Sequence, residues 1–452
     1  MKRWENSSDC NPIETATEDI ATVPPPKSWL SITFALLPGG AARIGIITIS
    51  SQAVNSATNF LTGVIIGRAC GKEQFGLYML GFSIVLFVMN VQNSLISTPY
   101  MVYSPRLSAS GHTRYAGSTL INQLGLSALA MLGLALGGGL ISLGIGPQEL
   151  EPVMWALVTV IAFIMLREYA RRVCFAGLRM ATALLVDMCV AVVQVSGLLL
   201  LAYLDDLSAS RAYCVIGTAC GLVALGWLIW SCRDFAFSLD QVTLDLARNW
   251  SFGKWIFASA MTWVMSANLY PWFLTTFYGT AETGIWAACI GIVALANPVF
   301  LGVGNLFGPK TAHAFAAEGP GKLRRTVIGG VGAFGLVIGP FCILAILFGG
   351  PLVVLAYGNE FADNGVVVSI LALNLLVSGV AFAFSSGLIV MERAKLDFMS
   401  NLLALALTFT VGLWFTKSFG VAGAAIAFLA ATGASSVAKY LLFNREINAH
   451  SR

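Results

Sequence analysis

The stretch GKEQFGLY, residues 71–78, is a short polar turn with a glycine at its first position and another at its sixth. Apolar segments flank it, residues 44–67 before it and residues 77–100 after it, and neither contains a charged residue. A helix rises about 1.5 Å per residue, so each segment is long enough to cross about 30 Å of hydrocarbon. The stretch therefore predicts two antiparallel transmembrane helices joined by a tight turn.

A similar stretch, GTAETGIW at residues 279–286, follows almost half a chain later. Three pairs of residues share an offset of 208 positions, and a Pro-basic pair that closes the second helix of each hairpin recurs with an offset of 204: Gly71 and Gly279, Gly76 and Gly284, Tyr78 and Trp286, then Pro105-Arg106 and Pro309-Lys310. The aromatic and proline matches count against chance spacing in a glycine-rich chain. We expect one fold built by duplication of a half.

The composition is that of a polytopic membrane protein. Of the 452 residues, 57% are hydrophobic and 11% are charged, whereas soluble domains carry about 25% charged residues. The net charge of +4 comes from residues in the loops and indicates no nucleic-acid partner. The nine cysteines are scattered and form no C-x-x-C pair, and there are three histidines. We expect no metal, no cofactor and no disulfide framework.

We predict twelve transmembrane helices, arranged as two pseudo-symmetric six-helix bundles around a central cleft. The predicted parts are a cytoplasmic tail with an interfacial entry segment (1–43), the first bundle (44–232), a cytoplasmic linker (233–253), the second bundle (254–443) and a tail (444–452). The predicted spans are 44–67, 77–100, 118–145, 153–177, 181–204, 212–232, 254–278, 285–308, 326–349, 364–391, 396–416 and 420–443.

The orientation follows from lysine and arginine, which concentrate in cytoplasmic loops. If the N-terminal tail and the loops after even-numbered spans share one side, 22 of the 26 basic residues fall there. The other side keeps Arg68, Lys72, Arg211 and Lys417. We therefore expect a multi-pass protein of the cell (inner) membrane with both termini in the cytoplasm. The outward loops are short and hold no domain, and no set of residues has a catalytic arrangement, so we expect no enzyme.

Charged residues at membrane depth are the first candidates for a site, because burying a charge there is costly. The predicted fourth span ends in Arg167, Glu168, Arg171 and Arg172. Arg167 and Arg171 share one helix face, and Glu168 and Arg172 share the neighbouring face and can pair. Two guanidiniums on one face suit a phosphate or pyrophosphate group. The alternative is a helix end that directs its cations to lipid headgroups. Asp187 lies inside the fifth span and either pairs with Arg179 or Arg172 or carries a coupling proton.

Uncharged polar side chains form a second set of cavity candidates. Gln52, Asn55 and Asn59 recur at helical spacing in the first span, so they face other helices or water rather than lipid. The remaining candidates are Asn90 in the second span, Asn297 and Asn305 in the eighth, where Pro298 predicts a kink, and Arg43 and Arg68 at helix ends. Interhelical hydrogen bonding and a hydrated cavity are both open explanations for these residues.

Three stretches carry a resemblance to a known family: residues 59–68 (NFLTGVIIGR), the glycine turn at 71–78, and residues 419–427 (FGVAGAAIA). They resemble the polysaccharide-biosynthesis flippases, the O-antigen translocase group of the multidrug/oligosaccharidyl-lipid/polysaccharide exporter superfamily. The resemblance implies two six-helix bundles around a cleft that opens alternately to each face. It also implies a lipid-linked oligosaccharide as cargo and a cationic cavity, for which Arg43, Arg68, Arg167 and Arg171 are the best matches.

The function expected from this resemblance is a flippase for a lipid-linked precursor of a polysaccharide such as O-antigen or lipopolysaccharide. Its expected partners are that lipid-linked oligosaccharide, membrane lipids, and a polysaccharide polymerase with export machinery. A cation-coupled multidrug exporter of the same fold, with Asp187 as coupling residue, is the first alternative. The first and seventh spans lack the carboxylate that drug antiporters of the superfamily generally need. A membrane glycan polymerase or ligase is the second alternative.

Overall fold

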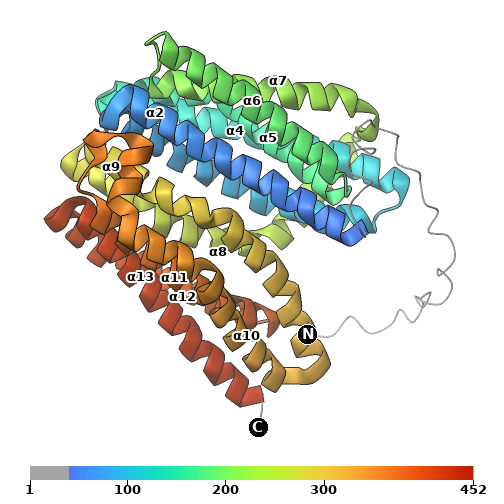
Figure 1. Ribbon diagram of the computed structural model, residues 1–452. Coiled ribbons are helices and arrows are strands. Elements are labelled where there is room, and N and C mark those ends of the chain that lie inside the picture. Colours follow the sequence, from blue (N-terminus) through green and yellow to red (C-terminus); the bar gives the residue numbers. More distant parts are fainter. Residues whose placement is uncertain (1–39, 451–452) are drawn as a thin grey trace, which may run out of the picture. The chain divides into compact units, whose positions relative to one another are not determined.

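The computed structural model describes the backbone of residues 40–450, and every regular element in that range is helical. The helical bundle lies within one compact unit, which begins at Ile46. The predicted tail and entry segment at residues 1–43 lie almost entirely outside the described residues. Figure 1 shows the helices of the first half, blue to green, gathered apart from those of the second half, yellow to red.

The first half runs from the start of the described chain to residue 230. Its elements are α2 (Gly40–Gln92), the π-helical turn η1 (Asn93–Ser97), α3 (Thr98–Tyr103), η2 (Ser104–Arg106), α4 (Ala109–Ser142), η3 (Gln148–Leu150), α5 (Glu151–Ala176), α6 (Met180–Tyr203) and α7 (Ala209–Trp230). The second half contains η4 (Cys232–Asp234), α8 (Leu239–Tyr278), α9 (Thr280–Val293), η5 (Ala294–Ala296), α10 (Asn297–Tyr357), η6 (Asn359–Phe361), α11 (Gly365–Val390), α12 (Ala394–Leu407), the π-helical turn η7 (Thr408–Gly412) and α13 (Leu413–His450).

Nine helices within the described residues are long and apolar enough to cross a membrane. Two of them, residues 46–103 and 394–449, have the length for two crossings, and each contains a glycine with non-helical backbone angles, Gly71 and Gly420. The all-helical membrane fold predicted from the sequence is therefore confirmed. The count of twelve spans and the domain boundaries stay predictions. The predicted break at Asn297-Pro298 is present, since the 3₁₀ turn η5 ends directly before α10 begins there.

The predicted repeat has a counterpart in the backbone. Gly71 has φ 76° and ψ −176°, and Gly279 has φ 87° and ψ −179°. These positive φ values lie in a region that side chains rarely allow, which is why glycine occupies both positions. The two halves thus make the same turn at residues 208 positions apart. The end of the bundle that holds these two turns is called the glycine end below.

The two halves touch through a reciprocal backbone contact at the glycine end. A side chain at Gly76 would overlap the carbonyl of Thr280, and one at Gly284 would overlap the carbonyl of Lys72. Lys72 and Thr280 are themselves 208 positions apart. A contact in which each half presents the same patch to the other is the arrangement that two-fold symmetry produces. We call Gly76, Gly284 and the backbone of Lys72 and Thr280 the glycine seam.

Buried aromatic residues follow the seam in both halves. Tyr78 stacks on Phe75 and Tyr213, with ring centroids 6.3 and 5.2 Å apart. Trp286, its counterpart at the same offset, stacks on Tyr270 at 5.7 Å. Stacked rings bury large apolar areas and hold helices at fixed distances. The core of each half is therefore built around the residue that closes its repeat motif.

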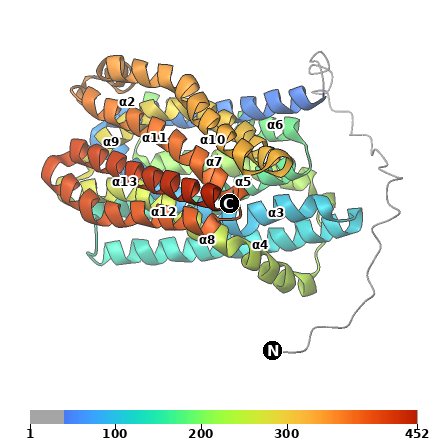
Figure 2. The same ribbon diagram turned by 90° about the horizontal axis from the view of Figure 1, so that it is seen from below.

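Helix α8 begins inside the range predicted as a linker, at Leu239. Its first turns lie beside α4 and α3, as Figure 2 shows from below. Asn249 accepts a hydrogen bond of 2.8 Å from the Tyr115 hydroxyl, and the Arg248 guanidinium lies 3.9 Å from the centre of the Tyr103 ring. The segment between the halves is thus mostly a helix that packs on the first half before it enters the second.

Candidate functional site

The last three turns of α5 carry four charged side chains, Arg167, Glu168, Arg171 and Arg172. Helix α5 ends at Ala176, and Leu178 with φ 54° turns the chain into α6 at Met180. Because the turn is this tight, α6 runs back alongside α5. Residues two turns into α6 therefore lie beside residues two turns before the end of α5, which brings Asp187 to the arginines.

Asp187 is the centre of the resulting cluster, and its side chain is completely buried. One carboxylate oxygen lies 2.5 Å from the guanidinium of Arg167, and the other lies 3.1 Å from Nε of Arg171. The hydroxyl of Ser51 donates to the same carboxylate. The sequence predicted Arg179 or Arg172 as its partner, and that pairing is wrong. Arg179 lies at the turn itself and pairs with Asp234 at 2.7 Å.

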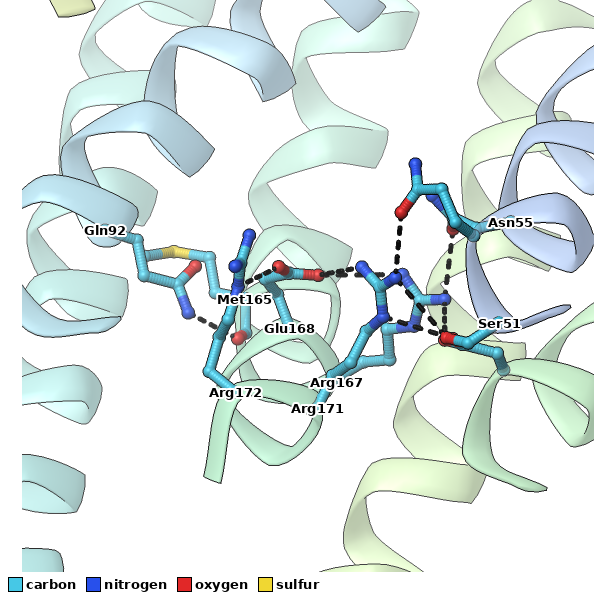
Figure 3. Close-up of polar contacts among 10 residues, drawn as sticks. Ser51, Asn55, Gln92, Met165, Arg167, Glu168, Arg171 and Arg172 are labelled. Atoms are coloured by element: carbon cyan, nitrogen blue, oxygen red, sulfur yellow. Dashed lines mark hydrogen bonds and ion pairs between the residues drawn. The ribbon is translucent and has the colours of Figure 1, made fainter. Parts of the chain in front are cut away.

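Helix α2 supplies the polar residues that face the arginines. The amide oxygen of Asn55 accepts a hydrogen bond of 3.2 Å from Arg167, and that of Gln52 accepts one of 3.3 Å from Arg171. Figure 3 shows Ser51 and Asn55 on the side of α2 that points toward Arg167 and Arg171. The polar stripe predicted on the first span is thus real, and part of it serves hydrogen bonding between helices.

Glu168 supplies the second carboxylate. It lies 2.7 Å from Nε of Arg172, the pairing expected from their spacing along the helix, and 3.6 Å from Arg171. We call these eight residues the arginine network: Ser51, Gln52, Asn55, Arg167, Glu168, Arg171, Arg172 and Asp187. Three guanidiniums face two carboxylates, so the network carries a net positive charge. A buried charge is tolerated when it is paired and hydrogen-bonded. Each guanidinium here has a carboxylate partner, while Nε of Arg167 bonds nothing among the described residues.

A cavity of about 550 Å³ lies between the two halves. Its walls are mainly apolar, with many aromatic rings, and carry several amides and hydroxyls. From the first half it is lined by Ser56, Asn59, Phe60, Phe75, Tyr78 and Phe82, and from the second by Trp263, Asn268, Asn297, Phe300, Tyr357, Asn374, Ser378 and Phe428, among others. We call it the central cavity.

The structure distributes the predicted site residues over several places. Gln52, Asn55, Arg167, Arg171 and Asp187 meet in the arginine network, whereas Asn59 and Asn297 line the central cavity. Arg68 lies at the glycine end, where it donates to the carbonyls of Leu355 and Ala356, and Asn90 donates to the carbonyl of Leu86 in its own helix. The side chains of Arg43 and Asn305 lie outside those described. Among the described residues, no arginine lines the central cavity.

A family profile for polysaccharide biosynthesis proteins matches residues 42–304, which is more than half of the chain. The matched range includes both glycine stretches and the whole arginine network. The chain belongs to the polysaccharide biosynthesis protein family. A comparison with curated proteins gives no match.

Three solved structures that share the fold of this polysaccharide biosynthesis protein come from transporters of the MATE family or the MOP superfamily. The inward-facing conformation of a multidrug resistance MATE family transporter of the MOP superfamily has a TM-score of 0.73 at 14% identity, over 89% of this chain and 99% of the other. An outward-facing conformation of a MATE family transporter has a TM-score of 0.62 at 14% identity, over 91% and 96%. A MOP superfamily transporter from Pyrococcus furiosus has a TM-score of 0.64 at 13% identity, over 91% of this chain and 96% of the other. At these identities the likeness establishes the fold alone.

Some site residues of this polysaccharide biosynthesis protein were not predicted from the sequence. Asn268 and Asn374 line the central cavity, and the buried amide oxygen of Asn374 has no hydrogen-bond partner among the described residues. In the second half, Asp397 forms a buried ion pair of 3.0 Å with Lys439. Asp397 follows Asp187 by 210 positions, close to the offset of the repeat, and this is the signal that would have found it. No cluster of metal-binding side chains occurs within the described residues.

Proposed function

We propose that this protein is a flippase that moves a lipid-linked oligosaccharide from the cytoplasmic to the outer leaflet of the cell membrane by alternating access. Both termini would then lie in the cytoplasm, and the glycine end would face outward. The family supports a role in polysaccharide biosynthesis, and the fold supports transport. The observation that carries the proposal is the central cavity between the two halves.

The chemistry of that cavity supports this class of cargo. A sugar head group cannot cross hydrocarbon unaided, because each unsatisfied polar group costs several kcal/mol there. A sugar ring offers hydroxyls at its edge and C–H groups on its faces. Amides such as Asn59, Asn297 and Asn374 can bond the hydroxyls, and aromatic faces such as those of Trp263 and Phe428 can contact the C–H groups. The lipid tail can remain in the membrane throughout.

The charge of the arginine network suits a diphosphate-linked carrier. Asn55 in the network and Asn59 in the cavity wall are one helical turn apart on α2. The net positive charge of the network therefore lies about one helical turn from the cavity wall. In surroundings of low dielectric constant, it lowers the energy of an anion in the cavity. The guanidiniums need not contact the phosphates for this effect, since electrostatic attraction acts over several ångströms.

Alternating access requires the halves to separate at one end while they meet at the other. In this structure they meet at the glycine seam, and at the other end of α8 its first turns also pack on the first half. Tyr357 also packs against Gly67 there, close enough that a side chain at Gly67 would overlap its ring. The TM-score is higher for an inward-facing solved structure than for an outward-facing one, 0.73 against 0.62. These observations support a state that is closed at the outward, glycine end.

A substitution in the cavity tests this role. Asn374→Leu should slow transport up to about tenfold, because a hydrogen bond between neutral groups contributes about 0.5–1.5 kcal/mol. The measurement is the rate at which lipid-linked glycan in membrane vesicles becomes accessible to an impermeant glycosidase added at the outer face. Asn90→Leu is the matched control, since the Asn90 amide bonds its own helix and is not among the residues that line the central cavity. Equal rates for the two variants would contradict the proposal.

The second candidate function is multidrug export, favoured by the aromatic cavity wall and by the MATE transporters of the same fold. Asp187 would be the coupling residue, but its carboxylate is bound by two arginines and a serine. We expect that overproduction in a host lacking its own efflux pumps leaves ethidium accumulation unchanged. A lower ethidium level, restored by Asp187→Asn at an equal amount of the protein in the membrane, would favour the exporter. A deletion strain that accumulates lipid-linked glycan in the inner leaflet would favour the flippase.

A further inference from the structure

The second half contains a pocket of its own, of about 310 Å³, lined by residues of α8, α10, α11, α12 and α13. We call it the side pocket. Its volume is at the lower end of the range for small-molecule sites, about 300–1,000 Å³. Trp263, Phe300, Ser378 and Phe428 line both the side pocket and the central cavity. The two spaces are therefore adjacent, and a ligand in one can extend into the other.

Hydroxyl groups in the side pocket are left without partners. Serine and threonine in transmembrane helices commonly bond the carbonyl four residues earlier, and Ser386 and Ser400 do so here. Ser259, Ser385, Thr432 and Ser435 line the pocket and, within the described part of the chain, bond nothing. Polar groups unpaired inside a helical bundle cost free energy unless a ligand or water satisfies them.

A buried ion pair lies at a part of the pocket that the central cavity does not share. Nζ of Lys439 lies 3.0 Å from Asp397, and both side chains are 8% exposed. The other carboxylate oxygen of Asp397 accepts a hydrogen bond of 3.3 Å from Asn401. Lys439 and Asn401 both line the pocket. An ammonium has three donors, so the one facing Asp397 leaves others for a ligand. The pair is neutral as a whole and suits a neutral polar ligand.

The exposed ring of Trp263 supplies an apolar face where the two cavities join. A pyranose ring has hydroxyls at its edge and C–H groups on its faces. The edge matches the four unpaired hydroxyls, the amide and the ammonium–carboxylate pair of the pocket, and the face matches the Trp263 ring. We propose that the side pocket binds a sugar ring of the transported glycan, as a subsite within the second half. This inference rests on the proposed flippase function, and it adds that the glycan is recognised by the second half while the positive charge lies in the first.

Protection of an introduced cysteine tests the subsite. Ser385→Cys reports on the side pocket, and Ser56→Cys, which lines only the central cavity, is the matched control. Both would be made in a chain whose native cysteines are replaced by serine or alanine and which still transports. The label is the small neutral reagent methyl methanethiosulfonate. Membranes come from cells with complete lipid-linked glycan and from cells that lack the first glycosyltransferase and hold only bare lipid carrier.

The expected result is that glycan slows labelling of Ser385→Cys while bare carrier does not. A site filled at ten times its dissociation constant is free about one-eleventh of the time, so labelling should slow roughly tenfold. Protection of Ser56→Cys without protection of Ser385→Cys would overturn the subsite and leave the flippase intact. If glycan protected neither cysteine, the proposed flippase function itself would be contradicted. Protection of Ser385→Cys by bare carrier would also overturn the proposal, because the pocket would then hold the carrier and not the sugar.

Discussion

Asp187→Asn should lower the free energy of unfolding by about 3–5 kcal/mol, the usual cost of removing one partner from a buried ion pair. The side chain of Asp187 is fully buried, and its negative charge offsets part of the positive charge of Arg167 and Arg171. Asparagine has nearly the same shape, so the loss comes from the charge and not from a cavity. Three guanidiniums would then share the single carboxylate of Glu168. The measurement is denaturant-induced unfolding of the purified protein in detergent.

Asp206→Asn is the matched control for this prediction. Asp206 pairs with Arg211 on the surface, where both side chains are about half exposed. Such surface pairs contribute about 0–1 kcal/mol, so this variant should unfold almost like the original protein. The double variant Asp187→Asn with Arg171→Gln should recover part of the lost stability, since it removes one unpaired cation. If Asp187→Asn and Asp206→Asn destabilised equally, the arginine network would not be the buried ion cluster described here.

The sequence predicted the fold because the repeat fixes backbone conformation as well as residue type. Gly71 and Gly279 occupy equivalent positions in the two halves because each adopts a positive φ. Gly76 and Gly284 are also equivalent, because each lies against a backbone carbonyl of the other half. The positive φ and the close carbonyl contact both exclude side chains, so glycine recurs at the same spacing in each half. This recurrence can be seen in the sequence alone. Helix ends were less predictable. Most of the linker range becomes the start of α8, because packing on α4 stabilises its first turns.

The arginine network was predicted only in part. Spacing along one helix correctly paired Glu168 with Arg172, because residues four apart are neighbours on any helix. The partner of Asp187 depends on how two helices lie after a turn, and spacing along the chain gives no such information. Reading the turn at residues 177–179 as tight and the helices as antiparallel would have placed Asp187 beside Arg171 rather than Arg179.

The side pocket left still less trace in the sequence. Asp397 and Lys439 lie near the ends of predicted spans, where charges are ordinarily assigned to the loops and headgroups. Their burial is a property of how α12 and α13 pack, with Asp397 and Lys439 both 8% exposed. The sequence feature that points to Asp397 is its offset of 210 positions from Asp187, which is close to the offset of the repeat. A single aspartate in the same helix of each half is a pattern that a search for repeated acids would detect.

Closure of the glycine end provides the other large effect. Gly76→Leu should reduce transport by about 5- to 150-fold, the factor that corresponds to 1–3 kcal/mol of overpacking. The obstacle is the backbone carbonyl of Thr280, which cannot move aside as a flexible side chain would. The closed seam is destabilised while each half keeps its own core, so the protein should accumulate in a state open at the glycine end. Gly284→Leu should do the same, because the contact is reciprocal.

The accompanying controls separate closure from folding. Gly125→Leu adds the same side chain in α4, where nothing lies within 4 Å of the new Cβ, and should transport normally. A cysteine at Asn59, which lines the central cavity, should react faster with an impermeant thiol reagent from the outer face in Gly76→Leu than in the parent. The two seam substitutions combined should reduce transport by less than the product of their separate effects, since either alone already opens the same contact. Normal transport by both single variants, with unchanged labelling at position 59, would mean that the halves do not close at the seam during the cycle.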